Sequence, residues 1–322
     1  RWLVYVGTLW MAIMLSLTGL VHNYWLLVLL AALAGLGTAA FHPQASTMIN
    51  ILSGNYKAVM LSGFVAFGNI GFALGPLFLV PLFQYYGLQA TVITVFPGII
   101  VTILLVLYAP RNADLSQTAP ELSEAWRSIK DARKELAAII SVIAIRSLAY
   151  TGMLTMLPLY FQSKNLSNIA ASRMLTIMLF AGAVGGILGG FISDYYGRKR
   201  LIVGSLILST PLFFAFLSTE GSVSMIFLGI AGATLLSSFS VTVIATQEAI
   251  PDNKALAAGL SMGLAGGIGG LAVVLIGRIA DHWGFYTAVF VLFLLPILAG
   301  MAALRMKSRP ASRTERMQLD NT

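Results

Sequence analysis

The sequence predicts an all-α protein that crosses a membrane many times. Of its 322 residues, 58% are hydrophobic and only 10% are charged, whereas soluble domains contain about 25% charged residues. The mean hydropathy is +0.86. Apolar runs close to the roughly 20 residues that a helix needs to cross a bilayer recur along the whole chain. The sequence therefore indicates a polytopic membrane protein built from helices.

Ten apolar runs are predicted to be transmembrane helices. Each is bounded by a short polar or glycine-containing break, such as His22 and Asn23 after the first run or Gly87 after the third. Four runs precede the longest polar segment and six follow it. The predicted spans are 2–20, 24–50, 59–85, 88–109, 137–162, 170–193, 201–218, 222–247, 256–282 and 285–304.

The distribution of basic residues predicts the orientation in the membrane. The net charge of +8 comes from short loops, so it indicates topology rather than a nucleic-acid partner. When the loop at 194–200 is assigned to the cytoplasm, Arg1, Lys57, Lys254 and the groups at 111–134, 198–200 and 305–316 fall on the same side. We therefore expect a multi-pass membrane protein with the linker and the C-terminal tail in the cytoplasm.

An internal repeat predicts two pseudo-symmetric halves. A shift of 197 residues places Gly7 on Gly204, Gly35 on Gly232 and Gly87 on Gly284 without gaps. Such parallel repeats are typical of large secondary transporters. Two spans precede Arg198 and none precedes its counterpart Arg1, so we expect a parent protein with two more helices, twelve in all, of which this chain holds ten.

The repeat also predicts the domain boundaries. Residues 1–109 would form an N-terminal half, 110–136 a cytoplasmic linker, 137–305 a six-helix C-terminal half and 306–322 a basic tail. In the linker, Leu122, Trp126, Ile129 and Leu136 recur at helical spacing. Either an amphipathic helix on the membrane surface or a solvated spacer fits this short stripe.

The stretch GGFISDYYGRKR, 189–200, gathers charges between two apolar runs. Its glycines let a neighbouring helix approach closely. Asp194 ends the preceding helix, and its carboxylate could pair with Arg198 in one conformation and release it in another. The predicted role of this pair is a latch.

This stretch resembles the loop signature of the major facilitator superfamily, Gly-x-x-x-Asp-x-x-Gly-Arg followed by two basic residues. Gly190, Asp194, Gly197, Arg198 and Lys199 match the signature. The resemblance implies a major facilitator fold in which these residues gate alternating access. It also implies a substrate site near the bilayer midplane, between the two halves.

Three further stretches are similar to the fosmidomycin-resistance branch of that superfamily, which exports antibiotics. They are GTAAFHPQAS (37–46), ATQEAIPDNKALAAGL (245–260) and GGLAVVLIGRIADH (269–282). Gln44 stands where the branch often has glutamate, so a proton-carrying role does not transfer to that position. The resemblance implies export of a small antibiotic in exchange for protons.

Arg146 lies about ten residues into its predicted span, where a charge is costly and marks a functional site by default. Its guanidinium could bind an anionic substrate group such as a phosphonate through two parallel hydrogen bonds. Alternatively, it could neutralise a carboxylate on a helix that this chain does not contain. The sequence leaves both roles open.

Three other polar residues within spans are candidate functional residues. His42 could bind substrate or carry protons near neutral pH, although we favour a hydrogen-bonded packing role. Asn69 could hydrogen-bond either the substrate or a neighbouring helix. Glu248 is the best remaining carboxylate for proton coupling, unless it only caps its loop.

These observations predict a secondary transporter that exports a fosmidomycin-type drug in exchange for protons. Uptake of a sugar or organic anion, and a membrane sensor that transports nothing, are the alternatives. We expect no enzyme, because no nucleophile with its base is evident, and no metal or other cofactor, because His22, His42 and His282 lack metal-ligand spacing. The expected partners are the substrate, protons and lipid, and the expected state is a monomer.

Overall fold

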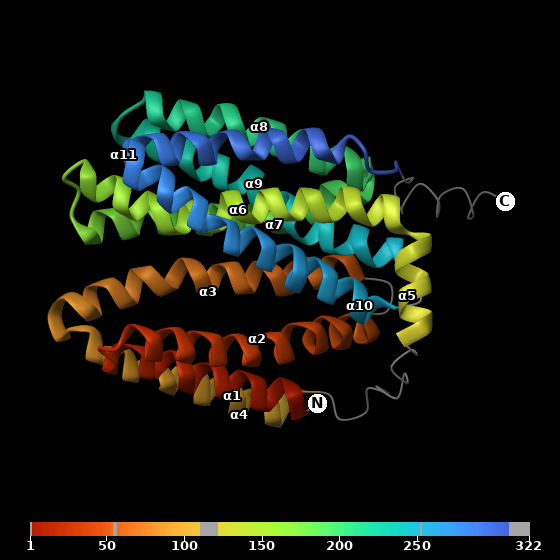
Figure 1. Cartoon of the computed structure of the whole chain (residues 1–322), viewed down its shortest axis with the longest axis horizontal. Helices are drawn as coiled ribbons and strands as arrows, with labels where there is room; N and C mark the ends of the chain where they lie inside the picture. The colour runs from red at the N-terminus through yellow and green to blue at the C-terminus, as the bar shows by residue number, and fades with distance from the viewer. Residues whose placement is uncertain (1, 54–56, 110–121, 252, 309–322) are drawn as a thin grey trace. The chain divides into compact units, whose positions relative to one another are not determined.

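The computed structural model describes residues 2–53, 57–109, 122–251 and 253–308, and helices make up nearly all of this part of the chain (Figure 1). The described residues contain no strand. The predicted all-α fold class is confirmed. In chain order, the elements are α1 (Trp2–Ser16), η1 (Leu17–Leu20), α2 (Tyr24–Leu52), α3 (Lys57–Tyr86), η2 (Leu88–Thr94), α4 (Val95–Tyr108), α5 (Leu122–Asp131), α6 (Arg133–Ser163), α7 (Asn168–Tyr196), α8 (Arg198–Ser218), α9 (Gly221–Ala249), α10 (Lys254–Ala258), η3 (Gly259–Ala265) and α11 (Gly266–Ala303).

The helices agree with the ten predicted spans. Among the described residues, nine helical segments are long and apolar enough to cross a membrane. The last of them, Leu256–Ala303, has 48 residues and contains two predicted spans, 256–282 and 285–304. Gly284 separates these two spans, because its φ of 83° is a left-handed conformation that interrupts the helix.

Two predicted spans are not regular α-helices throughout. The span predicted at 88–109 begins with a 3₁₀ segment, Leu88–Thr94, before α4 starts at Val95. The span predicted at 256–282 contains the π-helical segment Gly259–Ala265. Hydropathy measures how apolar a segment is, so it does not distinguish these hydrogen-bond patterns from an α-helix.

The chain divides into two compact units. Unit 1 comprises 1–55 and 78–119, and unit 2 comprises 56–77 and 120–322. In unit 1, α1 packs against α2 and α4. A Cβ built on Gly7 would lie 2.8 Å from the backbone oxygen of Gly37, so the two helices touch through their backbones. Such small-residue contacts hold membrane helices together where lipid removes the usual hydrophobic driving force.

Unit 2 contains α6–α9 and α11, which run alongside one another (Figure 1). Its core is apolar, and the rings of Phe213 in α8 and Phe293 in α11 stack with centroids 4.5 Å apart. Helices α7 and α9 approach as closely as α1 and α2. A Cβ on Gly185 would lie 2.1 Å from the backbone oxygen of Ala233, and one on Gly189 would lie 2.3 Å from that of Ser237.

Replacing Gly189 by valine should destabilise unit 2 by about 1–3 kcal/mol, because the added carbons overlap backbone atoms that cannot move aside. Thermal unfolding in detergent measures the effect as a lower Tm. Gly204→Val is the matched control, because a Cβ on Gly204 meets nothing within 4 Å. Equal Tm values for the two variants would contradict the close backbone contact.

The linker lies partly outside the described residues, which begin again at Leu122 after residues 110–121. The helix predicted there exists as α5. Part of its apolar stripe packs against protein, because Ile129 contacts a buried cluster that includes Leu136, Ile250 and Ala257. Trp126 on the same helix is exposed. Of the predicted basic tail, residues 309–322 also lie outside the described part.

A buried carboxylate joins the start and the end of the six predicted C-terminal spans. Glu135, in the first turn of α6, is only 7% exposed. Its two carboxylate oxygens accept hydrogen bonds from the backbone N–H of Lys307, at 2.9 and 3.2 Å. These bonds satisfy the buried charge and hold the chain just beyond α11 against α6.

Candidate functional site

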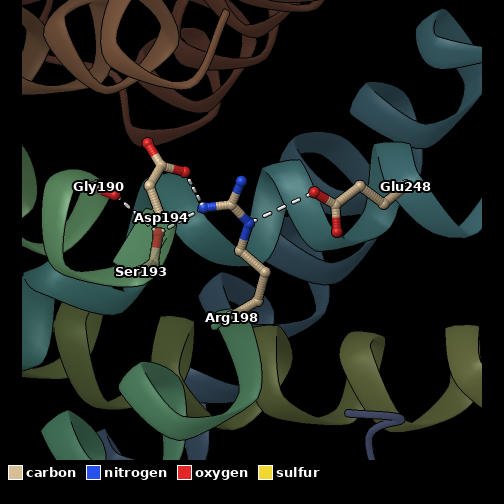
Figure 2. Close-up of polar contacts among 5 residues, drawn as sticks. All are labelled: Gly190, Ser193, Asp194, Arg198 and Glu248. Carbon is tan, nitrogen blue, oxygen red and sulfur yellow. Dashed lines mark hydrogen bonds and ion pairs between the residues drawn. The ribbon is translucent and has the colours of Figure 1, made fainter. Parts of the chain in front are cut away.

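The guanidinium of Arg198 lies between two carboxylates from different helices (Figure 2). Its Nη1 donates to Asp194 Oδ1 and, at 2.7 Å, to Ser193 Oγ. Its Nε donates to Glu248 Oε1 at 3.4 Å. Ser193 Oγ in turn donates to the backbone oxygen of Gly190 at 2.8 Å. A single cation therefore connects the C-terminal parts of α7 and α9.

The local sequence explains how Arg198 reaches both helices. α7 ends at Tyr196, and Gly197 adopts a φ of 89°, which strongly favours glycine. α8 then starts at Arg198, three residues before the predicted start at 201, because the chain turns at this one glycine. Asp194 and Arg198 lie four residues apart on either side of the turn, so their side chains meet.

The electrostatics of this cluster favour the contacts of Arg198 with Asp194 and Glu248. The guanidinium lies near the C-terminal ends of α7 and α9, whose dipoles favour a cation, while the dipole of α8, which starts at Arg198, opposes it. The Arg198 side chain is 12% exposed, and those of Asp194 and Glu248 are 21% and 34% exposed. Because partial burial reduces screening by water, the contacts are stronger than those of a fully exposed pair.

A second group of polar atoms lies on α6. Arg146 is 2% exposed, and its guanidinium carbon is 4.3 Å from the ring centroid of Phe239 in α9. Its Nε and Nη1 have no hydrogen-bond partner among the described residues, and neither has the buried hydroxyl of Tyr150, one helical turn further along. Buried polar groups are rarely left unsatisfied. Two such groups on the same face of one helix indicate a place for a ligand with hydrogen-bond acceptors.

The structure brings together some of the predicted site residues and not others. Asp194, Arg198 and Glu248 form one cluster, whereas Lys199 makes no hydrogen bond or ion pair with these described residues. Asn69 in α3 is 5% exposed, and its Nδ2 has no acceptor among the described residues. His42 lies in α2, directly before Pro43, and its ring makes an edge contact with Phe41.

Sequence reasoning missed three members of these groups, Ser193, Tyr150 and Phe239. Ser193 directly precedes Asp194, so its place in the network could have been found by testing each polar side chain near the turn. Phe239 carries a different signal, because the shift of 197 residues places it on His42. The repeat therefore places Phe239, the aromatic partner of Arg146, at the position that His42 holds in the first half, and His42 is itself a predicted site residue.

Comparison with known proteins identifies the family. The family model described as Major Facilitator Superfamily matches residues 1–255. The chain belongs to the major facilitator superfamily. Members of this superfamily are transporters rather than enzymes, so the chain is a multi-pass membrane transporter by family.

Relatives within the superfamily cover most of the chain. It is 28% identical over 306 residues to the fosmidomycin resistance protein of Escherichia coli (strain K12), covering 92% of this chain and 74% of that protein. It is also 28% identical over 278 residues to the uncharacterized MFS-type transporter YfnC of Bacillus subtilis (strain 168), covering 84% and 68% of the two chains. Multidrug resistance protein MdtG of Salmonella paratyphi A is 26% identical over 250 residues, covering 74% and 61%.

A solved structure of the superfamily confirms the fold. The transporter FucP in its outward conformation superposes with a TM-score of 0.68, covering 95% of this chain and 83% of FucP. The two sequences are 16% identical, so the likeness concerns the fold alone. The predicted major facilitator fold is confirmed.

Proposed function

We propose that this chain exports a small anionic drug-like molecule of the fosmidomycin type in exchange for protons, by alternating access in the bacterial inner membrane. The observation that carries the substrate class is the buried guanidinium of Arg146, whose Nε and Nη1 have no acceptor in the part of the chain that the structure describes. An anionic phosphonate supplies the missing acceptors and charge. Two relatives named as resistance proteins favour export over uptake.

The contacts of Arg146 define how it would hold such a substrate. The ring of Phe239 covers one face of the guanidinium and leaves its edge for in-plane hydrogen bonds. The hydroxyl of Tyr150 adds a donor from the same helix face. Asn69 and His42 remain proposed contributors to substrate binding.

The chain would act as a monomer, with its linker and tail in the cytoplasm.

The cluster around Arg198 would provide the gate. Asp194 and Glu248 hold Arg198 in one conformation, and movement of the turn at Gly197 relative to α9 breaks at least one of these contacts. The backbone oxygen of Gly190 accepts the hydrogen bond that orients Ser193, and Gly197 permits the turn on which the cluster depends. Lys199 adds positive charge beside it. Glu248 and, in the other half, His42 are the proposed proton carriers.

Drug accumulation in bacteria tests the proposal. The full-length protein is expressed in drug-sensitive cells, and intracellular fosmidomycin is measured with and without a protonophore. We expect lower accumulation that the protonophore reverses, because one charge crossing 100 mV supplies about 2.3 kcal/mol, enough for roughly a 50-fold gradient. Higher accumulation would establish uptake instead. Equal accumulation, with the protein present in the membrane, would favour a sensor.

Replacing Glu248 by glutamine should uncouple export from the proton gradient. The amide oxygen can still accept from Arg198 Nε, but glutamine cannot carry a proton. Net export should therefore fall at least tenfold, while exchange of labelled for unlabelled substrate in proteoliposomes continues. Glu220→Gln is the control, because Glu220 is an exposed carboxylate at the other end of α9. Unchanged protonophore-sensitive export by Glu248→Gln would exclude this residue as the proton carrier.

A further inference from the structure

A cavity of about 480 Å³ lies among α7, α8 and α9, apart from the residues assigned to substrate and gate. Gly204 in α8 lines it, and a Cβ on Gly204 would meet nothing within 4 Å. On the α7 side, Gly185 and Gly189 lie directly against the backbone of α9, so no space is left over them. The open space lies over Gly204, where α8 has no side chain to fill it.

The lining of this cavity is suited to an acyl chain. Leu188, Ile192 and Leu208 line it and are 53%, 44% and 52% exposed, so they face the lipid in a membrane-spanning unit. On α7 the lining extends from Gly185 to Tyr196, about 16 Å at 1.5 Å per residue. This is about half of the roughly 30 Å hydrocarbon core. The cavity therefore has the depth of one leaflet.

One end of the cavity is basic. Arg200 lines it beside Tyr196, at the end where α7 stops and α8 starts. Arg200 is exposed and forms no ion pair with another described residue. The nearby carboxylate of Asp194 is bound to Arg198. A guanidinium at the level where the helices leave the hydrocarbon matches the depth of a lipid phosphate.

We propose that this cavity binds one anionic phospholipid, with its phosphate on Arg200 and an acyl chain along Gly204. Charge and shape select the same occupant: the basic end takes an anionic headgroup, and the apolar part takes the chain. A soluble protein partner would leave the lipid-facing part unfilled. This site is independent of the transported substrate.

The first half of the repeat lacks this arrangement. The shift of 197 residues places Leu3 on Arg200 and Gly7 on Gly204. Leu3 carries no charge, and the space over Gly7 is occupied, since its Cβ would lie 2.8 Å from the backbone oxygen of Gly37. The site is therefore a feature of the second half and not a general result of the fold.

Native mass spectrometry of the full-length protein in detergent tests the proposal. The protein is titrated with phosphatidylglycerol or with phosphatidylcholine of the same acyl chains. We expect about fivefold preferential retention of phosphatidylglycerol, which corresponds to about 1 kcal/mol for one arginine at the membrane surface. Arg200→Gln should remove this preference. Arg305→Gln, which changes an exposed arginine outside the cavity, should retain it.

Variants that fill the cavity with a larger side chain provide a second test of the proposal. Gly204→Leu should reduce retention of phosphatidylglycerol to the level of phosphatidylcholine, and Gly277→Leu, on α11 with equally open space, should not. If Gly204→Leu fails to fold, Leu208→Trp fills the same cavity from an exposed position. Equal retention of both lipids by the unchanged protein would overturn the proposal. Retention that is lost in Arg200→Gln but kept in Gly204→Leu or Leu208→Trp would also overturn it. The lipid would then bind to surface charge and not in the cavity.

Discussion

Replacing Arg146 by methionine should lower export of a phosphonate drug roughly 100-fold, equivalent to about 3 kcal/mol of lost charge-assisted binding. Methionine keeps an unbranched apolar side chain beside Phe239 but supplies neither charge nor hydrogen bonds. Arg146→Lys should be intermediate, because an ammonium keeps the charge without the planar pair of donors. The measurement is the rate of drug transport into inverted vesicles, normalised to the amount of protein in the membrane.

Arg173→Met is the matched control for this prediction, because Arg173 is an exposed arginine on α7. It should leave transport unchanged. Full transport by Arg146→Met would exclude a substrate role for the buried guanidinium.

The stability of the same variant distinguishes the two roles that the sequence leaves open for Arg146. If the guanidinium of Arg146 binds substrate, Arg146→Met removes an unpaired buried charge from the substrate-free protein. The Tm should then be unchanged or higher. If it neutralises a carboxylate elsewhere in the full-length protein, methionine leaves that carboxylate buried and unpaired, which costs about 3–5 kcal/mol. Thermal unfolding without substrate therefore separates a binding residue from a structural one.

Replacing Asp194 by asparagine should slow transport of every substrate by about the same factor, roughly tenfold. Asparagine keeps the shape of the side chain but removes the charge that holds Arg198, so the conformation with this cluster closed loses stability. The remaining contact with Glu248 is longer, at 3.4 Å. Counterflow of two chemically different substrates in proteoliposomes measures the effect. A change of selectivity between them would show that Asp194 does not act as a gate.

Asp281→Asn provides the control for the gate. Asp281 is an exposed carboxylate on α11 that forms no ion pair within the described ranges. Its substitution changes the net charge by the same amount, so equal slowing by both variants would indicate a general charge effect rather than the loss of the contact with Arg198.

The spans were predictable because a bilayer imposes a minimum length of apolar sequence, whatever the helices contact. The pair of Asp194 and Arg198 was also predictable, since both lie at one turn. Glu248 was predicted only as a lone carboxylate. Its contact with Arg198 joins residues 50 positions apart, and only the packing of α8 against α9 determines it. The contact between Arg146 in α6 and Phe239 in α9 likewise depends on how these two helices pack.

Irregular backbone was the other part that sequence reasoning missed. The π segment Gly259–Ala265 is apolar and glycine-containing, like many regular membrane helices. Its end is held by a tertiary contact, in which Ser147 Oγ of α6 donates to the backbone oxygen of Gly266 at 3.1 Å. Such a bond between segments 119 residues apart has no local signal in the sequence.

The bonds between Glu135 and the backbone of Lys307 bear on the order in which unit 2 is assembled. The donor is made 172 residues after the carboxylate, roughly 10 to 30 s later at ordinary rates of translation. Until then α6 carries a carboxylate without this partner. The contact can therefore close only when α11 has been synthesised, and a chain that stops at Arg305 never closes it. The paired, buried state of Glu135 at the start of α6 therefore depends on complete synthesis of α11.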